Sequence, residues 1–210
     1  MKKLEIILIG GGGHCKSCID VIEQENKFSI AGIIDVKEKL GEKVLGYPVI
    51  GCDDDLDIIA EKYENFLITI GQLNNPSLRI KLFDKIKSLD KNLPVIISPK
   101  AYVSEHTKIE EGTIIMNGAI LNASSKIGKN CIVNTNALLE HDVVVGDHCH
   151  ISTSTTVNGE CKIGDSVFIG SKSVIVQEVE IKSDTFIGAG SVVIKNLSTG
   201  NYFGNPAKPY

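Results

Sequence analysis

Tryptophan is absent from the sequence, and aromatic residues make up only 5% of its 210 positions. The core of this chain must therefore consist mainly of aliphatic side chains. No apolar run approaches the roughly 18 residues that a membrane-spanning helix needs. The stretch from Met1 to Gly10 is too short, and is followed by too polar a segment, to be a secretory signal. We therefore expect a cytoplasmic protein without a membrane span.

An excess of basic residues is also missing. The chain has 22 Lys and Arg against 26 Asp and Glu, which gives a formal net charge of -4. A surface that binds nucleic acid is usually strongly basic, so we expect no nucleic-acid partner. Hydrophobic residues make up 42% of the sequence, a composition typical of a globular protein with room for one or two domains.

A repeat of six residues organises the second half of the chain. Residues 101–196 divide into sixteen blocks of six without an insertion, and the third position of every block is aliphatic, from Val103 to Val193. The first position is almost always small. This period fits neither a helix nor an ordinary alternating strand, whereas hexapeptide arrays are typical of parallel β-helices. We predict one short strand and one corner per block, with three blocks per coil and five coils. An antiparallel sandwich with chance periodicity is the alternative.

Small residues of the array have two expected uses. Glycines follow the inward aliphatic residue in several blocks, where we expect unusual backbone dihedral angles; they are Gly128, Gly146, Gly164, Gly170 and Gly188. Cysteines at first positions are expected to pack in the inner corners; they are Cys131, Cys149 and Cys161. Cys15 and Cys18 form a CxxC pair, but without a second pair or a thioredoxin pattern this is a weak metal or redox signal. All six cysteines are consistent with free thiols in a reducing compartment.

Residues 1–97 show a different pattern, in which short apolar runs alternate with helical periodicity. We expect strands at 4–9, 30–34, 66–70 and 95–97, and helices at 14–23, 54–63 and 77–89. Alternation of this kind predicts a small Rossmann-like α/β domain with a parallel sheet covered by helices. We place the boundary after residue 97, so that 98–210 form the β-helix and its tail.

Four consecutive glycines, Gly10–Gly13, lie between the first strand and the first helix. Backbone N–H groups at the start of a helix attract phosphate, and they can approach it closely where side chains are missing. The loop is an incomplete GxGxxG motif, because Cys15 stands where the third glycine should be. We therefore favour one nucleoside diphosphate over a dinucleotide, with Asp35 accepting hydrogen bonds from the base or the ribose. A purely structural turn is the alternative.

Imidazole, amide and carboxylate groups gather in four successive blocks of the array; they are Asn134, Glu140, His141, Asp142, His148 and His150. His141 lies two residues after inward Leu139, so its side chain should point out of the prism. Its neighbouring carboxylates can raise its basicity and fix its tautomer. A histidine held in this way is suited to accept a proton as a general base.

His141 and His150 are nine residues apart, which is half of an eighteen-residue coil. They should therefore lie on different sides of the prism. If both serve one site, a neighbouring subunit must complete that site or a long ligand must bridge it. We predict a homotrimer with active sites between the β-helices.

The whole chain resembles bacterial nucleotide-sugar acetyltransferases of the NeuD/PglD type. The resemblance rests on IGGGGHCKS at residues 9–17, ITIGQ followed by Arg79, the hexapeptide array, IVNTNALLEHD at 132–142, His150, and FGNPAKP at 203–209. It implies a left-handed β-helix and acetyl-CoA as co-substrate. It also implies N-acetylation of a nucleotide-linked amino sugar, which we expect to be a UDP-4-amino-4,6-dideoxy sugar of bacterial glycan biosynthesis.

The resemblance also implies roles for individual residues. His141 would be the general base that accepts the proton lost by the sugar amine. Asp142 would be the acid that increases its basicity, and Asn134 a residue near the sugar amine. We expect an outward backbone N–H as the oxyanion donor. No cysteine neighbours His141 in sequence, so we expect direct transfer without an acyl-enzyme. The residues implied to contact acetyl-CoA are His150, Gly170, Ser171, Gly188, Ala189, Pro206 and Lys208. Those implied to form the nucleotide-sugar site are Gly12, Gly13, His14, Asp35 and Gly71. Val36 stands where relatives sometimes carry a second acid, so base recognition is expected to differ.

Three other functions fit parts of the sequence. The same fold and base can acetylate a sugar hydroxyl, as on a sialic acid. Some trimeric β-helices are zinc hydratases, but His141, His148 and His150 are expected on different sides of the prism, so we expect no metal. A non-catalytic β-helix protein that binds nucleotide sugars is the third alternative.

Overall fold

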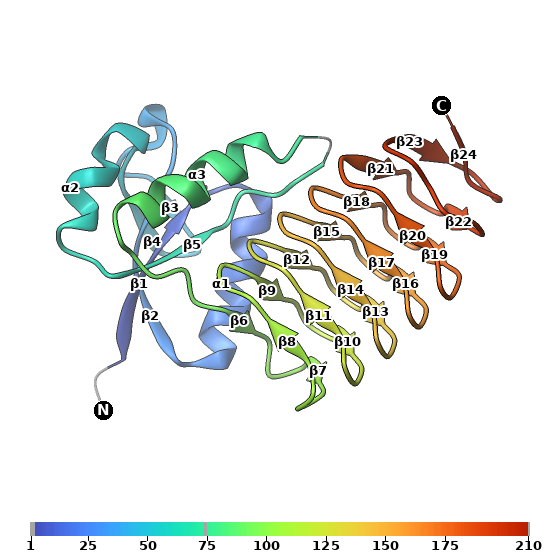
Figure 1. Cartoon of the computed structure of the whole chain (residues 1–210). Helices are drawn as coiled ribbons and strands as arrows, with labels where there is room; N and C mark the ends of the chain where they lie inside the picture. The colour runs from blue at the N-terminus through green and yellow to red at the C-terminus, as the bar shows by residue number, and fades with distance from the viewer. Residues whose placement is uncertain (1–2, 74, 210) are drawn as a thin grey trace.

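The computed structural model describes residues 3–73 and 75–209. It consists of an α/β unit followed by a long β-helix whose coils stack away from that unit (Figure 1). Both predicted fold classes are therefore confirmed.

The α/β unit has a five-stranded sheet in the order β3-β4-β2-β1-β5. The four strands β1, β2, β4 and β5 run parallel, while β3 is antiparallel to β4. The strands are β1 (Leu4–Ile9), β2 (Phe28–Ile34), β3 (Lys43–Val44), β4 (Tyr47–Gly51) and β5 (Asn65–Ile68). The helices are α1 (Gly13–Glu25), α2 (Leu56–Ala60) and α3 (Ser77–Ser88), with 3-10 turns η1 (Lys37–Lys39) and η2 (Asp53–Asp55).

Alternating side chains of β1 separate two hydrophobic clusters. Ile6 and Leu8 pack with α1 on one face of the sheet, and Ile7 and Ile9 pack with α2 and α3 on the other. Successive residues of a strand point to opposite faces. A strand that is covered on both faces must therefore be apolar throughout, as the run from Ile6 to Ile9 is.

The β-helix has three sheets. Each predicted block forms one short strand, and these strands pair in parallel between successive coils; the last strand of the third sheet, in the tail, is antiparallel to its neighbour. One sheet contains β7 (Tyr102–Val103), β10 (Ile120–Leu121), β13 (Leu138–Leu139), β16 (Thr156–Val157), β19 (Val174–Ile175) and β22 (Val192–Val193). The second contains β8 (Lys108–Ile109), β11 (Lys126–Ile127), β14 (Val144–Val145), β17 (Lys162–Ile163) and β20 (Glu180–Ile181). The third contains β6 (Ile96–Ile97), β9 (Ile114–Ile115), β12 (Ile132–Val133), β15 (His150–Ile151), β18 (Phe168–Ile169), β21 (Thr185–Ile187), β23 (Gly200–Phe203) and β24 (Lys208–Pro209).

The third-position aliphatic residues form the central column, as predicted. All of them from Ile115 onward are buried, and only Val103 and Ile109 in the first coil are partly exposed. The three first-position cysteines are fully buried in the same core and are free thiols.

The predicted backbone role of the array glycines is wrong. Left-handed φ angles occur at the sixth position of the blocks, which is usually not glycine; examples are Asp142 (φ 60°) and Glu160 (φ 62°). The glycines after the aliphatic residue instead allow neighbouring coils to approach closely. A Cβ on Gly128 would lie 2.6 Å from the carbonyl oxygen of Gly146, and one on Gly146 would lie 2.8 Å from the carbonyl carbon of Gly164.

Helix α1 lies between the α/β sheet and the β-helix. Its buried residues Cys15, Cys18 and Ile19 share one hydrophobic cluster with Ile114 and Ile132, on the outer face of the third β-helix sheet. The CxxC cysteines are therefore packing residues of this shared core, and burial raises the pKa of both thiols.

Some elements differ from those expected. The predicted last strand of the α/β sheet forms as β6, but it pairs with β9 and so begins the β-helix. The pair β3 and β4 was not predicted, and the helix expected at 54–63 is the shorter α2 preceded by η2. The tail forms β23 and β24, which fold back beside β21. The domain boundary after residue 97 stays a prediction.

Candidate functional site

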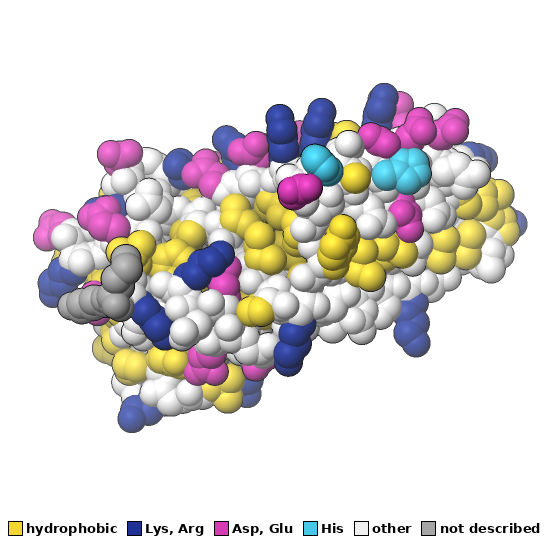
Figure 2. Space-filling model, turned by 90° about the horizontal axis from the view of Figure 1, so that it is seen from below, with side chains coloured by type: hydrophobic (Ala, Val, Ile, Leu, Met, Phe, Trp, Pro, Cys, Tyr) yellow, Lys and Arg dark blue, Asp and Glu magenta, His cyan; other side chains and the backbone are white. Residues whose placement is uncertain are grey.

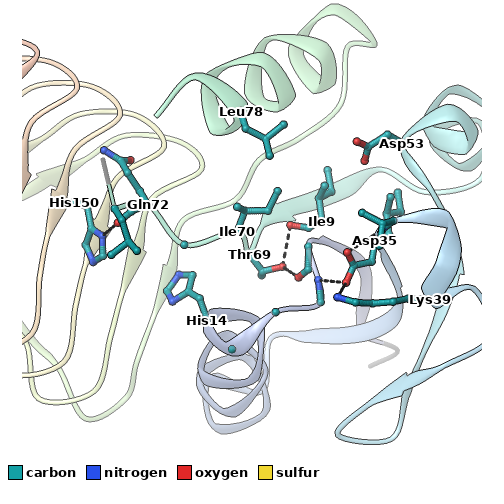
Figure 3. Close-up of a pocket in the computed structure, with 18 of the residues that line it drawn as sticks. Ile9, His14, Asp35, Lys39, Asp53, Thr69, Ile70, Gln72, Leu78 and His150 are labelled. Atoms are coloured by element: carbon teal, nitrogen blue, oxygen red, sulfur yellow. Dashed lines mark hydrogen bonds and ion pairs between the residues drawn. The ribbon is translucent and has the colours of Figure 1, made fainter. Parts of the chain in front are cut away.

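A pocket of about 560 Å³ opens where the carboxyl ends of β1, β2 and β5 meet the third sheet of the β-helix (Figure 3). The glycine loop and Asp35 line one end, and Asn134 and His150 line the other. In open α/β sheets, ligands bind at this edge. The structure thus brings the predicted nucleotide residues and two predicted β-helix residues into one cavity.

The glycine loop leaves room for a ligand at the start of α1. A Cβ on Gly12 or on Gly13 would meet no atom within 4 Å, and both residues are exposed. Gly10 has a different role, because its φ of +101° and the adjacent Ile70 side chain both disfavour a side chain. Gly71 also lines the pocket, and a Cβ added to Gly71 would lie 3.6 Å from the Cβ of His14. Gly12 and Gly13 therefore leave space at the N-terminus of α1, a position that favours binding of an anion.

Asp35 is fixed by three donors. Its Oδ2 accepts hydrogen bonds from the Gly11 N–H at 3.0 Å and from Lys39 Nζ at 2.8 Å, and its Oδ1 accepts one from the Val36 N–H at 2.8 Å. Burial alone would raise the pKa of this carboxyl, but the hydrogen bonds outweigh burial and lower it. Asp35 therefore stays ionised and holds the glycine loop, and a carboxylate has further lone pairs for a ribose or a base.

His150 connects the β-helix with the pocket loop. Its Nδ1 lies 2.6 Å from the backbone oxygen of Gln72, so this nitrogen must carry the proton and donate it. Nε2 is then the acceptor for the Asn134 amide, at 3.1 Å. The Asn134 side-chain oxygen accepts a hydrogen bond from the Thr135 N–H at 2.8 Å. His150 is 6% exposed, and burial lowers its pKa to about 4. A neutral His150 thus fixes the orientation of Asn134.

His14 lies at the start of α1, beside the same pocket (Figure 3). Burial, together with the charge of Arg79, lowers its pKa to about 3, so its imidazole is neutral at physiological pH. Its buried Nε2 has no hydrogen-bond partner, and neither has the buried Oε1 of Gln72. Buried polar atoms are normally paired. These two atoms are therefore available to polar groups of a ligand.

Arg79, in α3, joins the pocket loop to the β-helix. It is 1% exposed and donates from one guanidinium nitrogen to the backbone oxygens of Ile68 and Ile70, at 3.0 and 2.6 Å. Its other terminal nitrogen donates to the backbone and side-chain oxygens of Asn130, at 3.0 and 2.7 Å. Burial lowers the pKa of Arg79 to about 10, so it remains charged.

His141 lies elsewhere, on the corner between the first and second β-helix sheets. Its side chain is 59% exposed, which confirms the predicted outward direction. Nδ1 lies 2.9 Å from Asp142 Oδ2, and this hydrogen bond is the main cause of a raised pKa. In the neutral ring, Nδ1 carries the proton and donates a hydrogen bond to Asp142, and Nε2 keeps its lone pair. His141 and His150 are on different sides, as predicted, because β13 and β15 belong to different sheets.

The residues expected to contact acetyl-CoA lie on the third sheet side of the β-helix coils and in the C-terminal tail. Ser171 accepts or donates a hydrogen bond with Ser152 at 2.9 Å, close to Gly170 and Ala189 on adjacent coils. The ring of Phe203 covers Gly188, and Pro206 and Lys208 are exposed in the tail. Both ring nitrogens of His150 have partners within the chain. The roles of these residues stay predictions.

Sequence reasoning missed several residues of the pocket. Among the described lining residues, Lys39 is the only Lys or Arg. Its spacing of four residues from Asp35 was the sequence feature that could have indicated their ion pair. Thr69 donates to the backbone oxygens of Ile9 and Gly10, at 3.0 and 2.6 Å, and so joins β5 to the glycine loop. Gln72 acts through its backbone oxygen, which no side-chain pattern indicates.

Within residues 3–73 and 75–209, no three His, Cys, Asp or Glu side chains are grouped to hold a metal ion. His148 is half-buried, and its Nδ1 lies 3.0 Å from the Asn130 amide nitrogen. None of the described helices is long and apolar enough to cross a membrane.

Comparison with known proteins identifies both parts of the chain. Residues 5–86 match the PglD N-terminal domain, and residues 106–140, 124–159 and 160–195 match the bacterial transferase hexapeptide. A comparison with curated protein sequences finds no match.

Solved structures match over almost the full length. A variant of the perosamine N-acetyltransferase from Caulobacter crescentus, in complex with CoA and GDP-perosamine, is 32% identical with a TM-score of 0.92, covering 98% of this chain and 96% of that one. The acetyltransferase domain of PglB from Neisseria gonorrhoeae is 28% identical with a TM-score of 0.91, covering 98% and 99%. WeeI from Acinetobacter baumannii is 25% identical with a TM-score of 0.86, covering 99% and 100%. The chain therefore belongs to the family of sugar N-acetyltransferases that join a PglD N-terminal domain to a left-handed hexapeptide β-helix.

Proposed function

We propose that this protein transfers the acetyl group of acetyl-CoA to the amine of a nucleotide-linked amino sugar. One observation carries the proposal: a single pocket leads from the open glycine loop at the start of α1 to Asn134 and His150 on the β-helix. A nucleoside diphosphate fits the loop end, because helix N–H groups and Lys39 favour phosphate. The attached sugar then extends toward the β-helix.

The similar proteins support the same chemistry. The perosamine N-acetyltransferase was crystallised with CoA and GDP-perosamine, and the PglB acetyltransferase domain with acetyl coenzyme A. A uridine base, a 4-amino-4,6-dideoxy sugar and a role in bacterial glycan biosynthesis remain our predictions for this chain.

His141 is the proposed general base. The lone pair of the sugar amine attacks the thioester carbonyl, the C–S bond breaks, and the CoA thiolate leaves. Nε2 of His141 accepts the proton that the amine loses, while Asp142 stabilises the imidazolium through Nδ1. Asn134, whose orientation His150 fixes, contacts the sugar near its amine. The CoA contacts proposed for this chain are those of His150, Gly170, Ser171, Gly188, Ala189, Pro206 and Lys208.

We propose that three chains assemble so that His141 of one chain faces the pocket of its neighbour. The outward residues of the first β-helix sheet are mostly apolar; they are Tyr102, Ile120, Leu138, Thr156, Val174 and Val192. Tyr102 is 59% exposed and Ile120 is 40% exposed. Figure 2 shows hydrophobic side chains gathered along one side of the β-helix, with histidine side chains between them and a row of charged side chains. An exposed apolar face of this kind favours association, and it borders the corner that carries His141.

The direct test combines the purified protein with acetyl-CoA and a panel of UDP-linked and GDP-linked 4-amino-4,6-dideoxy sugars. CoA thiol release and the mass of the product report acetylation. The matched control is the same nucleotide sugar with a hydroxyl in place of the amine, and free sialic acid is a second acceptor. We expect thiol release only when the acceptor is an amino sugar. Release with the hydroxyl sugar or sialic acid would favour O-acetylation, and binding without release would favour the non-catalytic alternative.

A further inference from the structure

The fifth block position on the His141 corner forms a column of residues stacked coil upon coil. Its members are Glu105, Ala123, His141, Gly159, Gln177 and Lys195. Gly159 is the only glycine among them, and it lies one coil above His141. The two coils are fixed to each other here, because the Glu160 N–H donates to the backbone oxygen of His141 at 3.1 Å.

The backbone gives no reason for a glycine at position 159. Its φ is outside the left-handed region, unlike that of Gly10. No backbone atom is among the three atoms nearest to an added Cβ, whereas at Gly170 and Gly164 such a Cβ would meet the backbone of the next coil. The conformational explanation that applies to Gly10 and the coil-packing explanation that applies to Gly164 and Gly170 therefore do not apply to Gly159.

The three atoms nearest to a Cβ on Gly159 all belong to the His141 ring. The distances are 2.7 Å to Cε1, 2.8 Å to Nε2 and 3.3 Å to Nδ1. The imidazole thus lies directly against the Cα of Gly159, while Asp142 holds its opposite nitrogen. The ring is half-exposed and would otherwise be free to choose among rotamers. Two contacts, one hydrogen bond and one close steric contact, define its orientation.

We propose that Gly159 is a positioning residue for the transfer reaction: its missing side chain provides the space that orients Nε2 of His141 toward the acceptor amine. The inference rests on the proposed role of His141 as general base. Any side chain at position 159 must displace the ring by several tenths of an ångström, because the backbone of the next coil cannot move away. Displacements of this order strongly reduce reactions that depend on alignment.

The first test is Gly159→Ala. We expect kcat to fall by roughly 10 to 100 times, while the KM values for both substrates and the melting temperature stay unchanged, since the displaced ring can turn into solvent. The matched control is Gln177→Ala, in the same column one coil higher, which should leave kcat unchanged. A normal kcat in Gly159→Ala would overturn the proposal.

A double-mutant cycle separates positioning from a structural effect. In a His141→Ala background, Gly159→Ala should cause no further loss of kcat, because the ring that it displaces is gone. An equal loss in both backgrounds would show that Gly159 acts independently of His141 and would contradict the proposal.

A second measurement does not require activity. With 13C-labelled histidine, the Cε1 resonance of His141, assigned from the His141→Ala variant, should shift in Gly159→Ala while that of His106 does not. An unchanged His141 resonance would refute the steric contact. If the wild-type protein released no CoA with any amino sugar, the proposed function would fail, yet this experiment would still decide whether Gly159 orients the ring.

Discussion

The nucleotide pocket and the His141 corner are built in opposite ways. In the pocket, Asp35 has three donors and His150 has partners on both ring nitrogens, and both residues are largely buried. On the corner, the His141 side chain is exposed, and Asp142 is the only hydrogen-bond partner of its ring among the described residues. Exclusion of water strengthens the electrostatic interactions of an active site. The contrast agrees with our proposal that one chain binds the nucleotide sugar and that a second chain encloses the base.

The largest expected effect removes the base. His141→Ala should reduce kcat by about 10² to 10⁴, the usual contribution of general base catalysis. Binding of the nucleotide sugar, measured by calorimetry, should not change, because the glycine loop, Asp35 and Lys39 that line the nucleotide end of the pocket are unaltered. His106→Ala is the control, since His106 is also exposed. Near-normal turnover of the His141 variant would refute the assignment of the base.

The next prediction disrupts the proposed trimer and so tests the nucleotide pocket without the His141 corner of a neighbouring chain. Ile120→Lys places a charge on the apolar outward face of the first β-helix sheet, and desolvation of that charge opposes association. We expect monomers in sedimentation and a loss of activity on the order of tenfold or more, with nucleotide-sugar binding retained. The control is Val144→Lys, on the outward face of the second sheet, where the exposed fraction is similar: 37% against 40%. A trimer in Ile120→Lys, or a monomeric wild type, would contradict the proposed interface.

The sequence predicted the β-helix far better than it predicted the small strands. A column of sixteen aliphatic residues has one physical explanation, and each predicted block forms a strand. The strand β4 (Tyr47–Gly51) contains Pro48 and ends in Gly51, both of which disfavour strands. It forms because β2 offers a parallel edge, where Val49 and Gly51 of β4 pair with Ile33 and Ile34. Such tertiary pairing leaves no local signal.

Individual site residues could be named from sequence, but their connections could not. The outward direction of His141 follows from its distance to Leu139, and Asp142 is its sequence neighbour. In contrast, His150 donates to a backbone oxygen 78 residues away, and Arg79 joins a residue 51 positions away. Both contacts depend on how α3 and the loop after β5 pack on the β-helix. Backbone acceptors carry no residue-type signature, so no motif records them.

A third prediction changes the base without removing it. Asp142→Asn deletes the carboxylate that raises the pKa of His141. The neutral ring is the active form, so kcat/KM rises as pH increases through this pKa. In the variant the pKa is lower, and the acid limb of the pH profile should move to lower pH. The plateau should also fall, by roughly tenfold, because a weaker and less well oriented base accepts the proton.

Glu140→Gln is the matched control for this profile. Glu140 also raises the pKa of His141, but only through its charge and less than Asp142 does. Its Oε2 is occupied by the Asn122 amide at 2.7 Å. The shift of the acid limb should therefore be smaller than in Asp142→Asn. If the two variants shift equally, the hydrogen bond from Nδ1 does not set the basicity of His141.

The smallest effect is a change in the pH dependence of stability, which is absent at neutral pH. It distinguishes buried His150 from exposed His106. Burial lowers the pKa of His150 to about 4, whereas the unfolded chain has a value of about 6.5. Between these values the unfolded state binds more protons, so stability falls as pH decreases from 6.5 toward 4, by at most about 1.4 kcal/mol per pH unit for this group. His150→Asn should flatten the dependence of the unfolding free energy on pH in this window. His106→Gln is the control at an exposed position and should leave the slope unchanged. An unaltered slope in His150→Asn would show that His150 is protonated within the folded pocket, and its fixed tautomer could then not orient Asn134.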